Sequence, residues 1–161
     1  MSVLISNSQT RLEINPEKVR KTAQAVLNAL ACPDDELSIL IVDDLRIAEL
    51  NKEYLEREGP TNVIAFPMCD YFEAEDDIRK PERNIMPKLL GDVVISVDTA
   101  RKEGEKAGIT MEERFTQLLV HGILHLIGYD HEQTEAEALR MEMKTNELLK
   151  LIGGVPTDSL L

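Results

Sequence analysis

Apolar and polar positions recur along the chain with two periods, and together they predict alternating helices and strands. From Pro16 onward, apolar residues return every three or four positions, as in an amphipathic helix, and Asn15 is suited to cap its N-terminus. Mostly apolar segments at 37–42, 63–66 and 90–96 are typical of buried strands. We therefore expect one helix after residue 15 and three strands.

Capping residues and apolar spacing predict further helices at about 44–54, 97–107, 111–127 and 133–151. Thr110 with Glu113 forms the pattern of a capping box, and Thr134 with Glu137 repeats it. The third of these helices is apolar around most of its circumference, which indicates a central, buried helix. The order of elements favours an α+β, α/β-like fold with a small sheet, in a single domain over residues 1–161.

Composition narrows the classes of protein. The chain has 161 residues, of which 43% are hydrophobic and 30% charged, as expected of an ordered globular protein. Neither a signal peptide nor an apolar run of roughly 18 residues is present, so we expect a cytoplasmic protein with no membrane partner. The net charge of −12 argues against a simple nucleic-acid coat, but not against an enzyme that meets RNA through a local basic patch and a metal ion. Cys32 and Cys69 lack metal-ligand spacing and are expected to be reduced thiols.

All three histidines of the chain, His121, His125 and His131, fall within residues 121–131. The first two are four residues apart, which places both rings on one face of a helix. Gly128 permits the chain to leave that helix, so the following turn can bring His131 back to the same point. Three imidazoles would hold one Zn²⁺ ion per chain and leave a position open for water, although another divalent transition metal also suits them.

The same register of histidines and glycine occurs in the metzincin proteases, H-E-x-x-H-x-x-G-x-x-H. Here Gly122 stands where those proteases carry their glutamate base. A zincin-like metallohydrolase of another substrate, such as a peptide, is therefore an alternative that Gly122 weakens. The other explanation is that the histidines only pack, which this register makes much less favourable.

The stretch H-G-I-L-H-L-I-G-Y-D-H resembles the signature of the YbeY family, bacterial metal-dependent endoribonucleases. Leu50-Asn51-x-x-Tyr54, the block Pro60–Pro67 and the strand Leu90–Ile95 resemble further blocks of that family in the same order. The resemblance extends over residues 37–150, which is most of the chain.

This resemblance implies a small mixed sheet covered by helices, with zinc on His121, His125 and His131. It also implies cleavage of single-stranded RNA in small-subunit (16S) rRNA 3′-end maturation and ribosome quality control, with the small ribosomal subunit and ribosome-associated proteins as partners. The family usually has an arginine after the tyrosine matched to Tyr54, and that arginine is linked to activity. Leu55 stands there in this chain, and we hypothesise that Arg57 supplies the guanidinium. His121 and Arg57 are thus the candidate catalytic residues.

Other polar residues near these motifs have open roles. Asp130 or Asp92 could orient a histidine through its second ring nitrogen, or serve as a turn or cap residue. Thr61 and Asn62 could line the cleft or form an Asx-type turn, and Tyr129 could stack on a base or pack. A third function class also remains open, a ribosome assembly factor whose metal is mainly structural.

Overall fold

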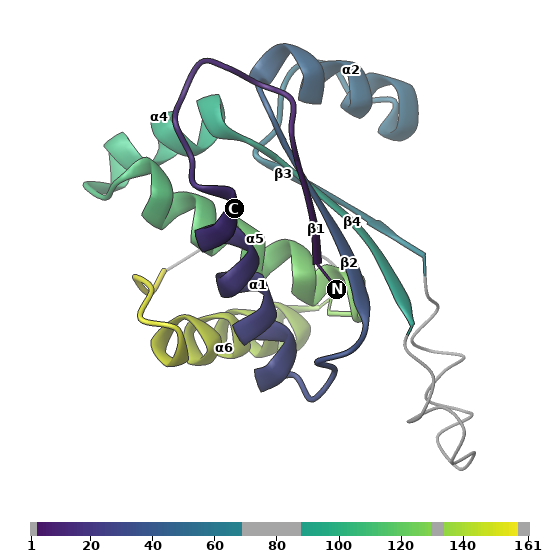
Figure 1. The fold of residues 1–161 in the computed structure, drawn as a ribbon, viewed down its shortest axis with the longest axis vertical. Helices are drawn as coiled ribbons and strands as arrows, with labels where there is room; N and C mark the ends of the chain where they lie inside the picture. Colours follow the sequence, from purple (N-terminus) through teal and green to yellow (C-terminus); the bar gives the residue numbers. More distant parts are fainter. Residues whose placement is uncertain (1–2, 69–87, 130–133, 158–161) are drawn as a thin grey trace.

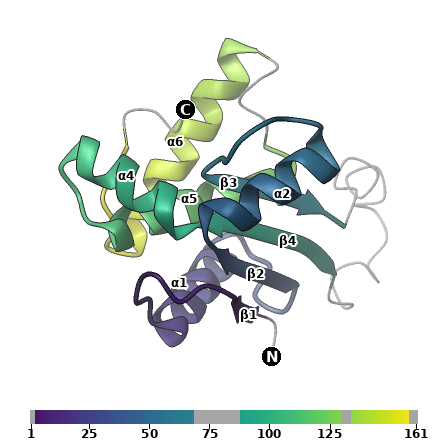
Figure 2. The same ribbon diagram turned by 90° about the horizontal axis from the view of Figure 1, so that it is seen from above.

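The apolar runs pair into one mixed sheet. The computed structural model describes residues 3–68, 88–129 and 134–157, and within them the strand order is β1-β2-β4-β3 (Figures 1 and 2). β1, β2 and β4 are parallel, and β3 runs antiparallel to β4 at the edge of the sheet. The strands are β1 (Val3–Asn7), β2 (Glu36–Val42), β3 (Val63–Pro67) and β4 (Leu89–Ser96).

Helices cover both faces of this sheet. α1 and α5 pack on one face and form the main core, while α2 packs its Ile47 and Leu50 on the other face. α4 and α6 contact α5 from its outer sides. The helices are α1 (Pro16–Ala29), α2 (Asp44–Leu55), α4 (Val97–Ala107), α5 (Met111–Leu126) and α6 (Glu135–Leu151). The α+β class and the small mixed sheet are as predicted.

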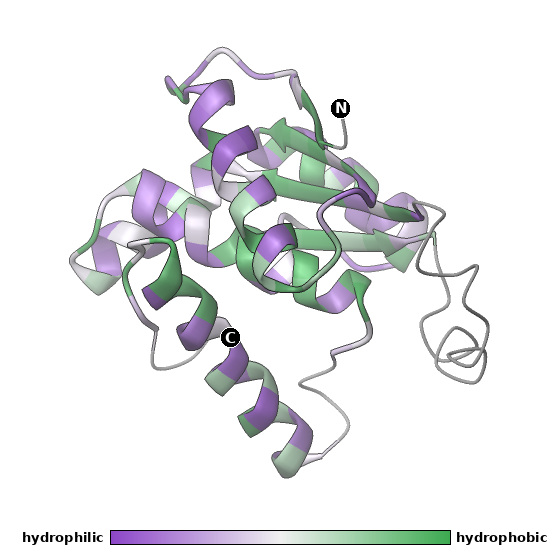
Figure 3. Ribbon diagram, turned by 60° about the horizontal axis from the view of Figure 1, so that its bottom comes forward, coloured by the Kyte–Doolittle hydropathy of each residue, from purple (hydrophilic) through white to green (hydrophobic). Residues whose placement is uncertain are grey.

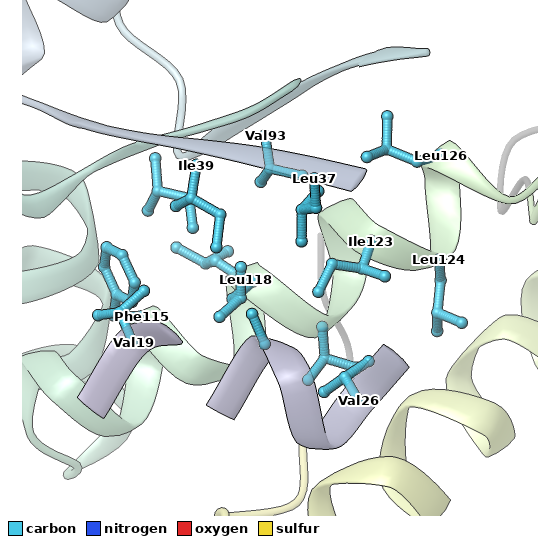
Figure 4. Close-up of a cluster of buried hydrophobic side chains, with 14 of the residues drawn as sticks. Val19, Val26, Leu37, Ile39, Val93, Phe115, Leu118, Ile123, Leu124 and Leu126 are labelled. Atoms are coloured by element: carbon cyan, nitrogen blue, oxygen red, sulfur yellow. The ribbon is translucent and has the colours of Figure 1, made fainter. Parts of the chain in front are cut away.

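α5 is the central helix of the protein. Its apolar side chains contact both the sheet and α1, as Figure 4 shows. Hydrophobic residues gather in the strands and in the helix beneath them, whereas the peripheral helices are mostly hydrophilic (Figure 3). In the described ranges, none of the helices combines the length and apolar character that crossing a bilayer requires. The buried residues of this cluster drawn and labelled in Figure 4 are Val19, Val26, Leu37, Ile39, Val93, Phe115, Leu118, Ile123, Leu124 and Leu126.

Local capping explains where the predicted helices begin. The side chain of Asn15 accepts hydrogen bonds from the backbone N–H groups of Glu17 and Lys18, and Thr110 with Glu113 forms the predicted capping box. The apolar pattern did not predict β1. This edge strand buries Val3 but leaves Leu4 exposed, so its stability comes from pairing with β2 rather than from a recognisable pattern of its own.

The carboxyl ends of β2 and β4 are joined through Asp44, the first residue of α2. Its carboxylate accepts hydrogen bonds from Ser96 Oγ (2.6 Å), Thr99 Oγ1 (2.6 Å) and Lys102 Nζ (2.9 Å). Burial by itself would raise the pKa of Asp44, but these three donors outweigh it and hold the pKa below its usual value of 3.8. Asp98 in turn accepts from the Asp44 backbone N–H, which links the N-termini of α2 and α4.

Asp44→Asn should destabilise the fold by about 1–2 kcal/mol at neutral pH, because the amide loses the charge-assisted bonds. A carboxyl with a lowered folded-state pKa stabilises the protein above its ordinary pKa and loses that contribution as the pH falls through the folded value. The difference between wild type and Asp44→Asn should therefore shrink below pH 3.8. Urea unfolding across pH 3–7 measures the free energy of unfolding of both proteins. Asp34→Asn, the same change at an exposed aspartate, is the control. An equal difference at every pH contradicts the prediction.

Candidate metal centre

Two of the predicted ligands lie together on α5. The Nε2 atoms of His121 and His125 are 3.1 Å apart, and their rings meet edge to face with centroids 4.6 Å apart. Two nitrogens bound to one tetrahedral zinc at roughly 2.0–2.1 Å are about 3.3–3.4 Å apart, so the pair fits a shared ion. The same distance permits one ring to donate a hydrogen bond to the other, which also keeps both nitrogens directed at one point.

Packing makes this pair rigid. His121 is only 6% exposed, and His125 is half-buried one turn further along the helix. Between them, Gly122 faces the sheet: a Cβ at this position would lie 2.6 Å from Val93 Cγ1 and 3.2 Å from Val63 Cγ2. The absence of a side chain therefore lets α5 lie directly on β3 and β4. This close packing sets the distance between the histidines and the edge strand.

The third predicted ligand, His131, lies outside the described residues, as do Asp130 and Cys69. In the described ranges, no group of three His, Cys, Asp or Glu side chains could hold a metal ion. The predicted centre therefore depends on His131, and its role stays a prediction.

Cys32 is unsuited to be a ligand. It is a half-buried free thiol beyond the end of α1, packed against the main core. Burial, with a smaller contribution from the carboxylate of Asp35, raises its pKa to about 11. The thiol is thus protonated at neutral pH, and Cys32 forms no disulfide within the described residues.

The structure separates the other candidate residues. Strand alternation puts Val93 toward α5 and Asp92 on the opposite, α2-covered face, so Asp92 cannot orient the histidines. Tyr129 packs against the main core, which favours the packing role. Arg57 is exposed just beyond α2, and in the part of the chain that is described no hydrogen bond or ion pair holds its guanidinium. Its placement beside a bound substrate stays a prediction.

The prediction of site residues missed Arg114 and Gln117, which share the histidine face of α5. Both are buried, with exposed fractions of 7% and 3%. Arg114, Gln117, His121 and His125 follow one another at intervals of three, four and four residues, which is the period of one helix face. A polar stripe of this period within an otherwise apolar helix was the available signal.

Comparison with known proteins finds one family, similar sequences and a similar fold. The family described as "Endoribonuclease YbeY" matches residues 4–153. A relative from Geobacter metallireducens is 46% identical over 153 residues, covering 94% of this chain and 96% of its own. One from Syntrophotalea carbinolica is 47% identical over 149 residues, covering 92% and 93%. A protein from Thermotoga maritima solved in solution has a similar fold, with a TM-score of 0.65, 19% identity and coverage of 93% and 88%.

Both relatives are named endoribonuclease YbeY. The proteins that this chain resembles are therefore nucleases. The chain belongs to the endoribonuclease YbeY family. The resemblance that the histidine motif indicated is confirmed.

Proposed function

We propose that this protein is a metal-dependent endoribonuclease that cleaves single-stranded RNA. The observation that carries the proposal is the pair of imidazole nitrogens 3.1 Å apart on a buried helix, in a chain of this family. Together with His131, the pair would hold one zinc or similar divalent ion. When bound, such an ion supplies Lewis acidity that stabilises negative charge on the phosphate in the transition state.

The residues of the chain itself would hold and orient the RNA. The exposed Arg57 guanidinium suits a non-bridging phosphate oxygen, which it can contact with two parallel N–H donors. RNA carries its own nucleophile, the 2′-hydroxyl beside the scissile phosphate, so that the attacking group is already in place. A peptide has no such internal nucleophile, and Gly122 offers no acid–base group and no room for one. These features favour RNA over a peptide as the substrate.

The family resemblance supports a role in small-subunit (16S) rRNA 3′-end maturation and ribosome quality control. We place the protein in the cytoplasm with the small ribosomal subunit and ribosome-associated proteins as its partners. With a net charge of −12, contact with RNA would have to be local, through few cations and the metal, rather than through a basic surface.

The test is cleavage of a 5′-labelled single-stranded fragment spanning the 3′ end of small-subunit rRNA, with added zinc and with a chelator. We expect cleavage that the chelator abolishes and zinc restores, and little cleavage of the same fragment annealed to its complement. A second substrate with a single 2′-deoxy nucleotide at the mapped site asks whether the 2′-hydroxyl attacks. A zinc-loaded protein that leaves the single strand intact would contradict the proposal and favour an assembly factor with a structural metal.

Arg57→Ala should lower kcat/KM for RNA by about 10–100-fold, the loss of roughly 1.5–3 kcal/mol expected for one charge-assisted contact. Arg46→Ala, which removes an exposed arginine of α2 whose partner Glu49 lies 3.4 Å away, is the matched control. Adding Leu55→Arg to Arg57→Ala should restore much of the activity, since it places arginine at the family position. Full cleavage by Arg57→Ala would remove Arg57 from the site.

A further inference from the structure

A chain of buried and half-buried polar side chains connects the histidine helix to the connection that precedes β3. We call the residues Asn62, Glu103, Arg114 and Gln117 the polar seam. Arg114 lies two helical turns before His121 and Gln117 lies one turn before it, on the same face of α5. The function proposed above does not use any of them.

Arg114 is the centre of the seam. Its Nε and Nη2 both lie 2.9 Å from Glu103 Oε1 on α4, and its Nη1 donates to Gln117 Oε1 at 2.9 Å. A guanidinium that is 7% exposed carries a large desolvation penalty, and removing its carboxylate partner would leave a buried charge without compensation. The geometry of Glu103 is therefore strongly fixed by Arg114.

Glu103, held in place by Arg114, also accepts hydrogen bonds from Asn62, the last residue before β3. The Asn62 Nδ2 group lies 3.2 Å and 3.3 Å from the two carboxylate oxygens of Glu103. The other side of the amide, Oδ1, accepts from the Val63 backbone N–H at 2.7 Å, and the Asn62 carbonyl accepts from Ser96 N–H at 3.1 Å. The strand ladder thus already holds the Asn62 backbone, and the bonds from Nδ2 add a sideways restraint toward α4 and α5.

The segment restrained in this way carries Arg57. Residues 56–62 leave α2 and arch back over the outer side of β3, as Figure 2 shows. β3 is also the strand whose Val63 lies against Gly122, beside His121. The connection and the histidines therefore flank the same edge strand, and the side chains of the seam link the connection to α5, the helix that carries the histidines.

We infer that Asn62, Glu103 and Arg114 are positioning residues that set the 56–62 connection relative to the histidine helix. The inference rests on the proposed function, since it assumes that RNA bound by the connection must be aligned with the histidines. Loosening the link changes how bound RNA is oriented, so it lowers kcat and leaves KM and metal binding nearly unchanged.

Asn62→Asp tests this link in full-length protein. The aspartate keeps an oxygen for the Val63 N–H, but it turns the group that faces Glu103 from a donor into a negatively charged acceptor. Combining it with Glu103→Gln moves the single carboxylate of the seam from residue 103 to residue 62, so the charge that compensates Arg114 stays in the seam. The new glutamine amide can donate to the new aspartate, and its carbonyl oxygen can still accept from Arg114. The control is Asn28→Asp, the same change on the exposed side of α1, where Asn28 accepts from Gln24.

Cleavage kinetics on the labelled single-stranded rRNA fragment, zinc affinity by chelator competition and the melting temperature are measured for each protein. We expect Asn62→Asp to lose about 10–100-fold in kcat with nearly unchanged KM and zinc affinity, and the double variant to recover most of the loss. Unchanged kcat in Asn62→Asp, or a loss that follows only the melting temperature and is not rescued, overturns the inference. If zinc-loaded wild type cleaves no RNA, the proposed function itself fails and the inference falls with it.

Discussion

Replacing His125 with alanine should abolish stoichiometric zinc binding and lower RNA cleavage by about a thousandfold or more. The imidazole is one of two nitrogens that the structure holds 3.1 Å apart, so its loss leaves His121 alone on the helix. A metal ion contributes several kcal/mol to stabilising transition-state charge, and each 1.36 kcal/mol is a factor of about ten in rate. We expect the same loss for His121→Ala and for His131→Ala.

Two comparisons separate a ligand role from a packing role for His125. His125→Cys restores a possible zinc ligand at this position, so it should regain part of the zinc affinity that the alanine variant loses. Melting temperatures in excess chelator should be similar for wild type and His125→Ala, because the half-buried ring adds little packing. Zinc bound at one ion per chain by His125→Ala, measured by metal analysis after dialysis, would show that His125 is not a ligand.

Much of the fold could be predicted because its signals are local. Asn15 and Thr110 cap helices by bonds to residues two and three positions away, so the sequence alone contains both partners. β1 lacks such a signal. It has one well-buried side chain, Val3, and it is a strand because β2 offers it a parallel edge from a distant part of the chain.

The candidate site also contains residues whose placement follows from local sequence and residues whose placement depends on distant parts of the chain. The spacing of His121 and His125 fixes their shared face before any tertiary structure forms, and the structure places them as expected. The partnership of Arg114 with Glu103 depends on how α4 folds back along α5, which no local pattern encodes. The role of Asp92 stayed open in the sequence because no local pattern showed which face of β4 it occupies, and the contact of Val93 with α5 places it on the opposite face.

Gly122→Ala should destabilise the protein by about 1–3 kcal/mol, the usual range for forcing an extra methyl into a packed core. The expected sign is unusual, because replacing a helical glycine with alanine normally stabilises a helix by up to about 1 kcal/mol. Here the new methyl would meet Val93 Cγ1 at 2.6 Å, so α5 must move away from the sheet. Since His121 precedes this residue, the displacement should also weaken zinc binding.

A double-mutant cycle with Val93→Ala tests whether that contact is the cause. Val93→Ala alone removes fully buried methyl groups and should cost about 2 kcal/mol. In its background, Gly122→Ala should cost much less, because both Val93 contacts are gone and only the 3.2 Å contact with Val63 Cγ2 opposes the gain in helix propensity. Urea unfolding of the four proteins gives the coupling energy, and a value near zero would falsify the contact as the reason for glycine.

The same contact predicts the outcome of installing the zincin base. Gly122→Glu restores the H-E-x-x-H pattern, yet its side chain starts against Val93 and Val63 rather than in open space above the histidines. We expect a larger loss of stability than for alanine, loss of zinc affinity and no peptidase activity on an unfolded casein substrate. A folded, zinc-loaded Gly122→Glu protein that hydrolyses casein would mean that α5 can shift without losing its metal. In that case the glycine would reflect the choice of substrate rather than the packing of the histidine helix on the sheet.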